Sequence, residues 1–559
     1  MEVNDVAAMW DVLKKEVWHA DEDTLLRAIM DEGLREELFR KEGSDLGFDS
    51  PYVLWPHVKQ CEASGCDNKQ KGLKLHTVSQ KKAILLSLTG PKPAWSISFT
   101  CNACKTVYHQ DYWVTEGTRY YYPDMTAAIQ IGDHHYAEVK VLNGWRWSMN
   151  NGWMSATNCM KTYLIQHADV SLPESWNLTL SLSHRQVYSG FILHALWLDS
   201  IRHHHPLILP HSGEHRERFT LAVKDRNARI HQHGLRERYH RCKKCVREYD
   251  DGRQVWVVVC DGCTVGRWRC AFGSCTNPLE STKDHFCAGH TRLEDVCAVA
   301  ECTAEARPGY QTCGLQAHIL LEQRYRDRGQ AAFKLKELLS KSRMPHPNSS
   351  DLIPLPDDEE DELVVDDEGT AVPESEAMKD RPLTKVKAMF GRRRTHNEQL
   401  LVFPCGIIAA RETFFHSESL PSVAHFFKNT FAGGYCPNHL IFDNNCGLAK
   451  HVKGTDPAFD NVGLAVDVFH FQCKHSEQDV YCQKYCNPAS FPELMTEDGK
   501  GWWFNTSVCE QTNNWFGGFQ SICREMEGHF YDFFLDEMVM MRNELNLKSL
   551  SGSEPTYWV

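Results

Sequence analysis

Cysteine and histidine residues recur at metal-ligand spacing in a tandem between Cys270 and His318. The two units read Cys270-x4-Cys275-x11-Cys287-x2-His290 and Cys297-x4-Cys302-x10-Cys313-x4-His318. Each unit offers three thiolates and one imidazole, a donor set that suits a closed tetrahedral zinc site without an open position for catalysis. A segment this short, with few large aliphatic side chains, needs the free energy of zinc binding to fold. We therefore predict two structural zinc sites here.

A second group of cysteines lies nearer the N-terminus. It combines Cys61-x4-Cys66 with Cys101-x2-Cys104, two pairs separated by a long excursion that contains a basic patch over residues 69–82. Four thiolates also suit a closed zinc site. His109 is a possible substitute ligand. We predict a third zinc site in this part of the chain.

Two further arrangements are less defined. Cys473-x-His475 with Cys482-x3-Cys486 has zinc-ligand types, and His470 and Cys446 offer competing arrangements for this site. The pair Cys242-x2-Cys245 has no evident partner pair. Cys260 with Cys263, or His240, could complete it.

Three carboxylates follow patterns that place them at the ends of secondary-structure elements. The β-branched run 255–259 ends in Cys260-Asp261-Gly262, and the apolar run 440–442 ends in Asp443-Asn444-Asn445. Glu510 falls in the first turns of a helix expected over about 507–526. Two strand-tip aspartates and a helical glutamate are hard oxygen ligands, and such ligands can hold two Mg²⁺ or Mn²⁺ ions for phosphoryl transfer. Each signal is weak alone, because Asp-Gly and Asp-Asn are also turn signals.

The elements that must position these residues alternate along the chain. Residues 1–55 and 166–240 have helical spacing of apolar residues, and strand-like runs occur at 95–100 and 120–122. After residue 395, runs at 400–408, 413–415, 440–442 and 464–471 flank a helical stretch at 420–431. This pattern predicts a mixed α/β fold with helices packed on a sheet.

Composition narrows the class of protein. The 559 residues favour three or four domains, and no apolar run approaches the roughly 18 residues of a membrane span. The first residues resemble neither a secretory signal nor a transit peptide, so we expect an intracellular protein in which 23 cysteines favour metal over disulfides.

Charge is distributed unevenly along the chain. The net charge of −13 opposes nucleic-acid binding, but residues 351–376 carry twelve acidic residues and no Lys or Arg. The remainder is therefore close to neutral. Residues 341–394 combine this acidic run with prolines and a basic end at 392–394, so we expect a disordered linker whose arginines can serve nuclear import.

The motifs together resemble the fungal cysteine-cluster proteins associated with KDZ (Kyakuja-Dileera-Zisupton) transposases. The first cluster is carried by Cys61, Cys66, 101–104 and the run 153–159, and the second by the tandem, which follows the strand Val257-Val258-Val259-Cys260-Asp261-Gly262. The later part, with 403–408, 442–446, 467–471, 482–488 and 509–513, resembles a KDZ transposase core.

The resemblance implies a ribonuclease H-like core that is split by a zinc-cluster insertion. Its acidic triad falls on Asp261, Asp443 and Glu510. The expected segments are 1–55 (helical), 56–165 (first zinc module), 166–240 (helical), 241–268 (first core strand), 269–330 (tandem insertion), 341–394 (linker) and 395–559 (remainder of the core).

Two functions follow from this resemblance. One is a zinc-binding transposase or nuclease of a transposable element that acts on DNA in the nucleus with Mg²⁺ or Mn²⁺, in addition to structural Zn²⁺. The other is a catalytically inactive, domesticated module that binds DNA or protein partners through its zinc clusters. The second is kept open because a Gly-Glu pair with a further Glu usually precedes the terminal helix, and this chain has only Cys509-Glu510.

Overall fold

The protein has a mixed α/β structure that divides into two compact units, Met1–Ala228 and Arg229–Val559. The computed structural model describes residues 52–58, 60–73, 75–213, 217–273, 275–341, 361–365, 384–475, 478–550 and 556–557. The helices expected within residues 1–51 lie outside these ranges. Among the described helices, none is both long enough and apolar enough to cross a membrane.

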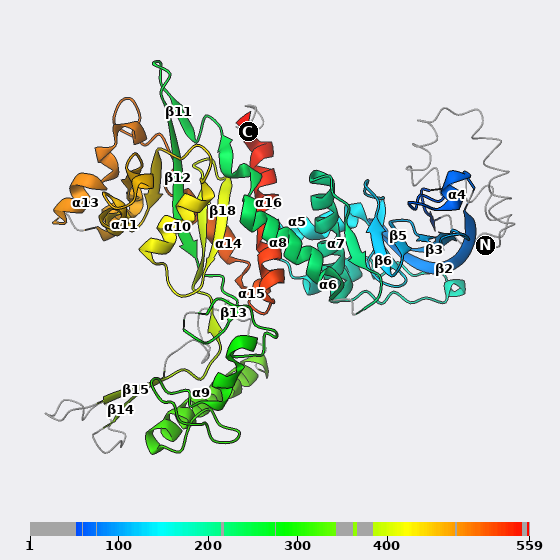
Figure 1. Ribbon diagram of the computed structural model, residues 1–559, viewed down its shortest axis with the longest axis horizontal. Helices are drawn as coiled ribbons and strands as arrows, with labels where there is room; N and C mark the ends of the chain where they lie inside the picture. The colour runs from blue at the N-terminus through cyan, green and yellow to red at the C-terminus, as the bar shows by residue number, and fades with distance from the viewer. Residues whose placement is uncertain are drawn as a thin grey trace. The chain divides into compact units, whose positions relative to one another are not determined.

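The first unit is built on a nine-stranded sheet in the order β7-β8-β2-β3-β4-β5-β6-β9, with β1 paired to β3. Its strands are β1 (Val53–Leu54), β2 (His76–Ser87), β3 (Gly90–Thr100), β4 (Val107–Tyr108), β5 (Tyr112–Thr115), β6 (Thr118–Tyr121), β7 (Ala128–Gln130), β8 (His135–Glu138) and β9 (Ile208–Pro210). The long hairpin β2–β3 curls strongly (blue in Figure 1).

Two of these strands correct the sequence-based segments. β1 falls at the end of the segment expected to be helical, because Val53 and Leu54 pair in parallel with Trp95 and Ser96 of β3. β9 falls within the second helical segment and pairs with β6. In both cases an unpaired sheet edge supplies hydrogen bonds that override the local helical pattern.

Helices α5 (Val139–Gly152) and α7 (His184–Arg202) contact strands of this sheet. The unit also contains α4 (Asp67–Gln70), α6 (Ala156–Gln166) and 3₁₀ turns at Glu174–Trp176 and Glu217–Phe219, and the boundary with the second unit falls within α8 (Thr220–His233). Ser183 and Gln186 form a capping box at the start of α7. The buried indoles of Trp176 and Trp197 donate hydrogen bonds to the backbone oxygens of Ala83 and Tyr122 at 2.9 and 2.8 Å, respectively. These bonds fasten the helical segment of the unit to its sheet.

The second unit contains a six-stranded mixed sheet in the order β18-β17-β12-β19-β20, with β11 paired to β12. Its strands are β11 (Val246–Glu248), β12 (Gln254–Cys263), β17 (Asn397–Val402), β18 (Ile408–Phe414), β19 (His439–Phe442) and β20 (Gly463–Ala465). β12, β19 and β20 run parallel, and β17 is antiparallel to both β12 and β18. The run 255–260 of β12 is buried on both faces, as expected of a central strand.

Helices pack on both sides of this sheet. They are α10 (Leu420–Thr430), α11 (Asn445–Val452), α12 (Val468–Lys474), α13 (Val480–Tyr485), α14 (Val508–Gly517), α15 (Gln520–Cys523) and α16 (Gly528–Leu550). Figure 1 shows α10 and α16 on opposite sides of β18. Short 3₁₀ turns lie at Arg236–Tyr239, Pro457–Phe459, Pro488–Ser490 and Pro492–Leu494, and β10 (His240–Arg241) pairs with β21 (Thr556–Tyr557).

Two local predictions for this unit are wrong. The run 464–471 is not one strand, because Asp467 accepts hydrogen bonds from the N–H groups of Phe469 and His470 and so begins helix α12. The single helix expected over about 507–526 is instead α14 and α15, which are separated at the adjacent glycines 517 and 518.

The tandem insertion separates β12 from β17, although the two strands are neighbours. The chain between these two strands contains a 3₁₀ segment (Ala288–Asp295), α9 (Gln316–Lys341) and the hairpin β14 (Asp361–Val365) with β15 (Thr384–Ala388). At its base, β13 (Trp268–Arg269) pairs with β16 (Arg393–Arg394).

The predicted disordered linker over 341–394 is therefore wrong for residues 361–365, which form β14, and for residues 384–394. Residues 384–394 are folded, because Ala388 and Phe390 are buried against the second tandem unit and the guanidinium groups of Arg392 and Arg394 lie over the Trp268 ring. Residues 342–360 and 366–383, which include most of the acidic run, lie outside the described ranges.

Candidate metal centres and the carboxylate edge

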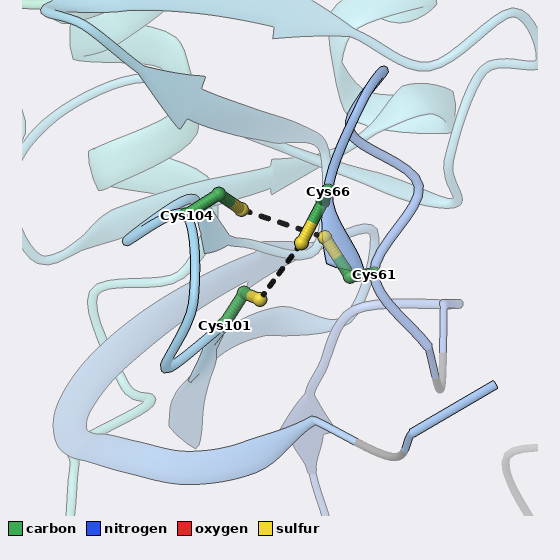
Figure 2. A group of neighbouring side chains, drawn as sticks. All are labelled: Cys61, Cys66, Cys101 and Cys104. Atoms are coloured by element: carbon green, nitrogen blue, oxygen red, sulfur yellow. Dashed lines mark hydrogen bonds between the residues drawn. The ribbon is translucent and has the colours of Figure 1, made fainter. Parts of the chain in front are cut away.

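The four cysteines of the N-terminal cluster converge from two turns. Cys61 and Cys66 precede α4, while Cys101 and Cys104 occupy the turn after β3, and their ligand atoms all lie within 4.8 Å of one another. Figure 2 shows the four sulfur atoms pointing toward a common centre. The Cys61–Cys104 and Cys66–Cys101 sulfur distances are 3.5 and 3.6 Å.

These sulfur distances identify the kind of interaction. A disulfide has an S–S length of about 2.05 Å, whereas tetrahedral zinc with Zn–S bonds of about 2.3 Å places two sulfurs ~3.8 Å apart. The observed distances fit the edges of a zinc tetrahedron. The group can therefore hold zinc, and it is complete without His109, whose ring instead packs on Tyr112.

Neighbouring groups hold the thiols of this cluster in place. The fully buried Tyr108 hydroxyl lies 3.3 Å from Cys61 Sγ and accepts from the N–H of Glu62 at 2.9 Å. Burial raises the pKa of Cys61 to about 12. At Cys101 burial acts in the same direction, but the backbone N–H groups of Cys104 and Ala103 lower its pKa to about 6. Donors of this kind favour a thiolate, the form that binds metal.

Both tandem units bring their four predicted ligands together. Cys270, Cys275, Cys287 and His290 form one group, and Cys297, Cys302, Cys313 and His318 form the other. In the first, Nδ1 of His290 lies 3.5 and 3.4 Å from the sulfurs of Cys270 and Cys287. In the second, Nδ1 of His318 lies 3.4 and 3.3 Å from Cys297 and Cys313.

The cluster near the C-terminus differs from the prediction at two residues, Cys473 and Cys486. Cys446, His475 and Cys482 form the group, with Nδ1 of His475 at 3.3 and 3.2 Å from the two sulfurs. Cys473 is exposed, because it lies on the outer face of α12, and Cys446 takes its place. The predicted Cys486 is fully buried beside Cys446, and its hydrogen bond raises the pKa of the Cys446 thiol.

The three predicted carboxylates meet at one edge of the core sheet. In the parallel register of β12 and β19, Cys260 is opposite Phe442, so Asp261 and Asp443 leave adjacent strands at the same level. Glu510 lies in the first turn of α14, which packs on β12 and is held there by a 3.1 Å hydrogen bond from Cys509 Sγ to the Val259 oxygen.

His470 links the carboxylates of this edge. Its Nε2 lies 3.0 Å from Asp443 Oδ2, and its Nδ1 lies 3.5 Å from Glu510 Oε1 and 3.4 Å from Asp467 Oδ2. Asp443 and Glu510 are 33% and 42% exposed, so solvent and a substrate can reach them. One imidazole thus contacts carboxylates from β19 and α14.

Asp261 occupies the most buried position of the three. It accepts from Asn513 Nδ2 at 2.7 Å and from the N–H of Gly262 at 2.8 Å. Burial, together with the negative charge of Asp443, raises the pKa of Asp261 to about 7. Because the two aspartates leave adjacent strands at the same level, their negative charges repel each other, and a divalent cation would relieve this repulsion.

Comparison with known proteins places the clusters in a family context. Residues 50–167 match the model described as a CxC5 like cysteine cluster associated with KDZ transposases. Residues 259–324 match the model of a CxC6 like cysteine cluster associated with KDZ transposases. The chain carries two KDZ-associated cysteine clusters. Neither the curated proteins nor the solved structures contain a match to it.

These matches confirm the predicted family association. The CxC5-like cluster contains the four-cysteine group, and the CxC6-like cluster contains both tandem groups and begins within β12, at residue 259. Asp443, Glu510 and the group around His475 lie outside both matched segments.

Sequence reasoning missed three contributors to the carboxylate edge, Asn513, Asp467 and His470, the last of which was offered only as a competing zinc ligand. Asn513 follows Glu510 by three residues, which is the helical spacing that puts both side chains on one face. Asp467 directly precedes an apolar helix, a typical N-cap position, and so could have been assigned from its sequence context.

Proposed function

We propose that this protein is a zinc-stabilised, transposase-like enzyme that cleaves or joins DNA with two divalent metal ions held by Asp261, Asp443 and Glu510. The observation that carries the proposal is the placement of both aspartates on adjacent parallel strands, with Glu510 linked to Asp443 through His470. Carboxylate oxygens from neighbouring strand ends and a nearby helix are hard ligands that suit a pair of Mg²⁺ or Mn²⁺ ions.

The topology of the core sheet supports a ribonuclease H-like core. Five strands follow the order third, second, first, fourth, fifth, and the second strand alone runs against the others. In such a core the catalytic carboxylates come from the tips of the first and fourth strands and from a later helix. Here these positions are Asp261, Asp443 and Glu510.

When bound, the two metal ions would activate the attacking hydroxyl and stabilise the leaving oxygen of a phosphodiester. The chain's own residues set the geometry. Asn513 and the N–H of Gly262 orient Asp261, and His470 holds Asp443 and Glu510 in position. DNA is the proposed substrate because both cysteine clusters are of types associated with transposases, and a DNA substrate would place the protein in the nucleus.

A cleavage assay with supercoiled and linear DNA, in Mg²⁺ and in Mn²⁺, tests this function. We expect metal-dependent cleavage that Asp443→Asn abolishes while zinc content and DNA binding are retained. Asp251→Asn, at an exposed aspartate paired only with Arg253, is the matched control and should cleave normally. Equal activity of the two variants would exclude the proposed site.

A catalytically inactive binding module is the second candidate, and the position of His470 favours it. The imidazole of His470 contacts both Asp443 and Glu510 and so occupies a position between two of the carboxylates that would bind the metal ions. Under this alternative the wild-type protein binds DNA or a protein partner through its zinc clusters, without cleavage in either metal.

A further inference from the structure

A fifth group of metal-ligand side chains lies in the second unit, outside both family matches. His240, Cys242, Cys245 and Cys405 place one ligand atom each within 4.8 Å of the others. His240 and Cys245 are fully buried, and Cys242 and Cys405 are half-buried. Three thiols and one imidazole that converge in this way are the donor set of a closed Cys₃His zinc site.

The local backbone has the form of a metal-binding turn. Between β10 and β11, the N–H groups of Cys245 and Val246 both donate to the Cys242 oxygen, at 3.0 and 2.9 Å. The N–H of Cys242 points at Cys245 Sγ at 3.1 Å, which stabilises a thiolate there. The Cys242–Cys245 sulfur distance of 3.5 Å is far too long for a disulfide and close to the edge of a zinc tetrahedron.

Cys405 reaches this turn from a distant part of the chain. It lies in the tight connection between β17 and β18, where Gly406 has a φ of 88° and its N–H donates to the Phe403 oxygen at 2.7 Å. The ring of Phe403 in turn stacks on that of Trp256 in β12, with the ring centroids 5.2 Å apart. The connection is thus fixed beside the first half of β12, at the end of the sheet away from Asp261.

The cysteines that the sequence also offered as partners for Cys242 and Cys245 form hydrogen bonds in another part of the unit. The thiol of Cys260 accepts from Gln399 Nε2 at 3.3 Å within the sheet, and the thiol of Cys263 donates to the Asn513 oxygen at 3.5 Å. Both face the carboxylate end of β12. His240, which the sequence also offered, joins the group, whereas Cys405 was not anticipated.

We propose that His240, Cys242, Cys245 and Cys405 bind a structural zinc ion that fastens the start of the core sheet to the β17–β18 connection. Three thiolates and one imidazole leave no open position, so this zinc has no catalytic role. Its ligands come from both sides of the tandem insertion. The ion therefore closes the long loop that separates β12 from β17 and offsets part of its closure entropy.

Zinc analysis of the purified full chain tests the proposal. We expect Cys242→Ser and Cys405→Ser each to lose one zinc per chain relative to the wild type, and the double variant to lose one rather than two, because both residues bind the same ion. Cys436→Ser, at an exposed cysteine of the same unit, should retain the full zinc content. Unchanged zinc content in Cys405→Ser would overturn the proposal.

A second measurement covers variants that do not fold. In the wild-type chain, the half-buried thiols of Cys242 and Cys405 should resist alkylation while zinc is bound and become reactive together as a chelator removes it. Modification of both thiols in the zinc-loaded protein at the rate of exposed Cys436 would contradict zinc binding here. The proposed cleavage site is not involved in either readout, so failure of one proposal leaves the other intact.

Discussion

The Nε2 atom of His475 lies 3.1 Å from the backbone oxygen of Asp443, while its Nδ1 faces the sulfurs of Cys446 and Cys482. Because a carbonyl oxygen can only accept, Nε2 carries the proton and Nδ1 is free to bind metal. Helix α12 places His475 at this cysteine group and His470 at the carboxylates. The C-terminal cysteine group is thus physically joined to the proposed catalytic edge.

We predict that zinc at this group positions Asp443. Cys446→Ser should lower zinc affinity by more than the roughly 10- to 100-fold typical of losing an outer-shell partner, because it removes a ligand itself, and should reduce DNA cleavage because the Asp443 backbone loses its support. Zinc titration and the cleavage assay on the same preparation measure both effects. Cys473→Ser is the control, since this exposed thiol lies beside His475 in sequence but outside the group. Equal zinc affinity in the two variants would contradict Cys446 as the ligand and would favour the sequence-based assignment of Cys473.

The first tandem unit should depend on zinc for its fold. Among the described residues, its ligands Cys270, Cys275 and Cys287 themselves form the small buried cluster of this segment, with the partly buried Leu279 and Phe286 packed against it. We predict that Cys287→Ser loses one zinc per chain and makes residues 270–296 sensitive to protease, because zinc supplies on the order of 10 kcal/mol to such segments. Protease resistance equal to that of Cys436→Ser would show that packing alone suffices.

A buried ion-pair network should be essential to the second unit. Arg411 on β18 contacts Glu398 of β17 and Asp536 of α16, and all three side chains are at least nine-tenths buried. Tyr531 also donates to Glu398 at 2.8 Å. We predict that Arg411→Met lowers the free energy of unfolding by about 3–5 kcal/mol, because it leaves buried carboxylates unpaired.

Chemical denaturation monitored on this unit checks the prediction. Arg253→Met is the control, since Arg253 pairs with Asp251 at the surface and its loss should have no measurable effect. A similar stability for both variants would mean that the network is dispensable.

Asp111 should make the stability of the first unit depend on pH. Burial raises its pKa from 3.8 to about 6, although the Gln130 N–H donates to Oδ2. Below about pH 4 the carboxyl is protonated in both the folded and the unfolded states, so its burial does not lower the free energy of unfolding. Above pH 6 it is charged in both, and the buried charge costs about 3 kcal/mol.

The variant Asp111→Asn removes this cost. The difference in free energy of unfolding between Asp111→Asn and the wild type should shift in favour of the variant as the pH rises from 4 to 6, and then level off. Comparing the two at each pH cancels the effect of zinc loss in acid. A difference that does not vary with pH would contradict the raised pKa.

Local patterns predicted the central elements because their signals are strong. The valine-rich run 255–259 is typical of a buried strand, and the two cysteine units that begin at Cys270 and Cys297 have similar ligand orders and spacings. The positions of Asp261, two residues before the end of β12, and of Asp443, directly after β19, followed from such runs.

Other features depend on contacts between residues that are distant in sequence. Nothing near Cys405 indicates that its turn will lie against Cys242, and the choice of Cys446 over Cys473 depends on which face of α12 is turned inward. The fold of residues 384–394 likewise depends on β13 and on Trp268, which lie before the tandem insertion. Spacing alone does not encode such pairings.

The most direct test of the central claim is Mn²⁺ binding by the zinc-loaded chain, measured from the electron paramagnetic resonance signal of free Mn²⁺. The carboxylate edge predicts Mn²⁺ binding in the wild type and its loss in Asp261→Asn, Asp443→Asn and Glu510→Gln, with Asp251→Asn unaffected. Wild-type protein that binds no Mn²⁺, or three variants that bind it as the wild type does, would contradict the proposed metal site.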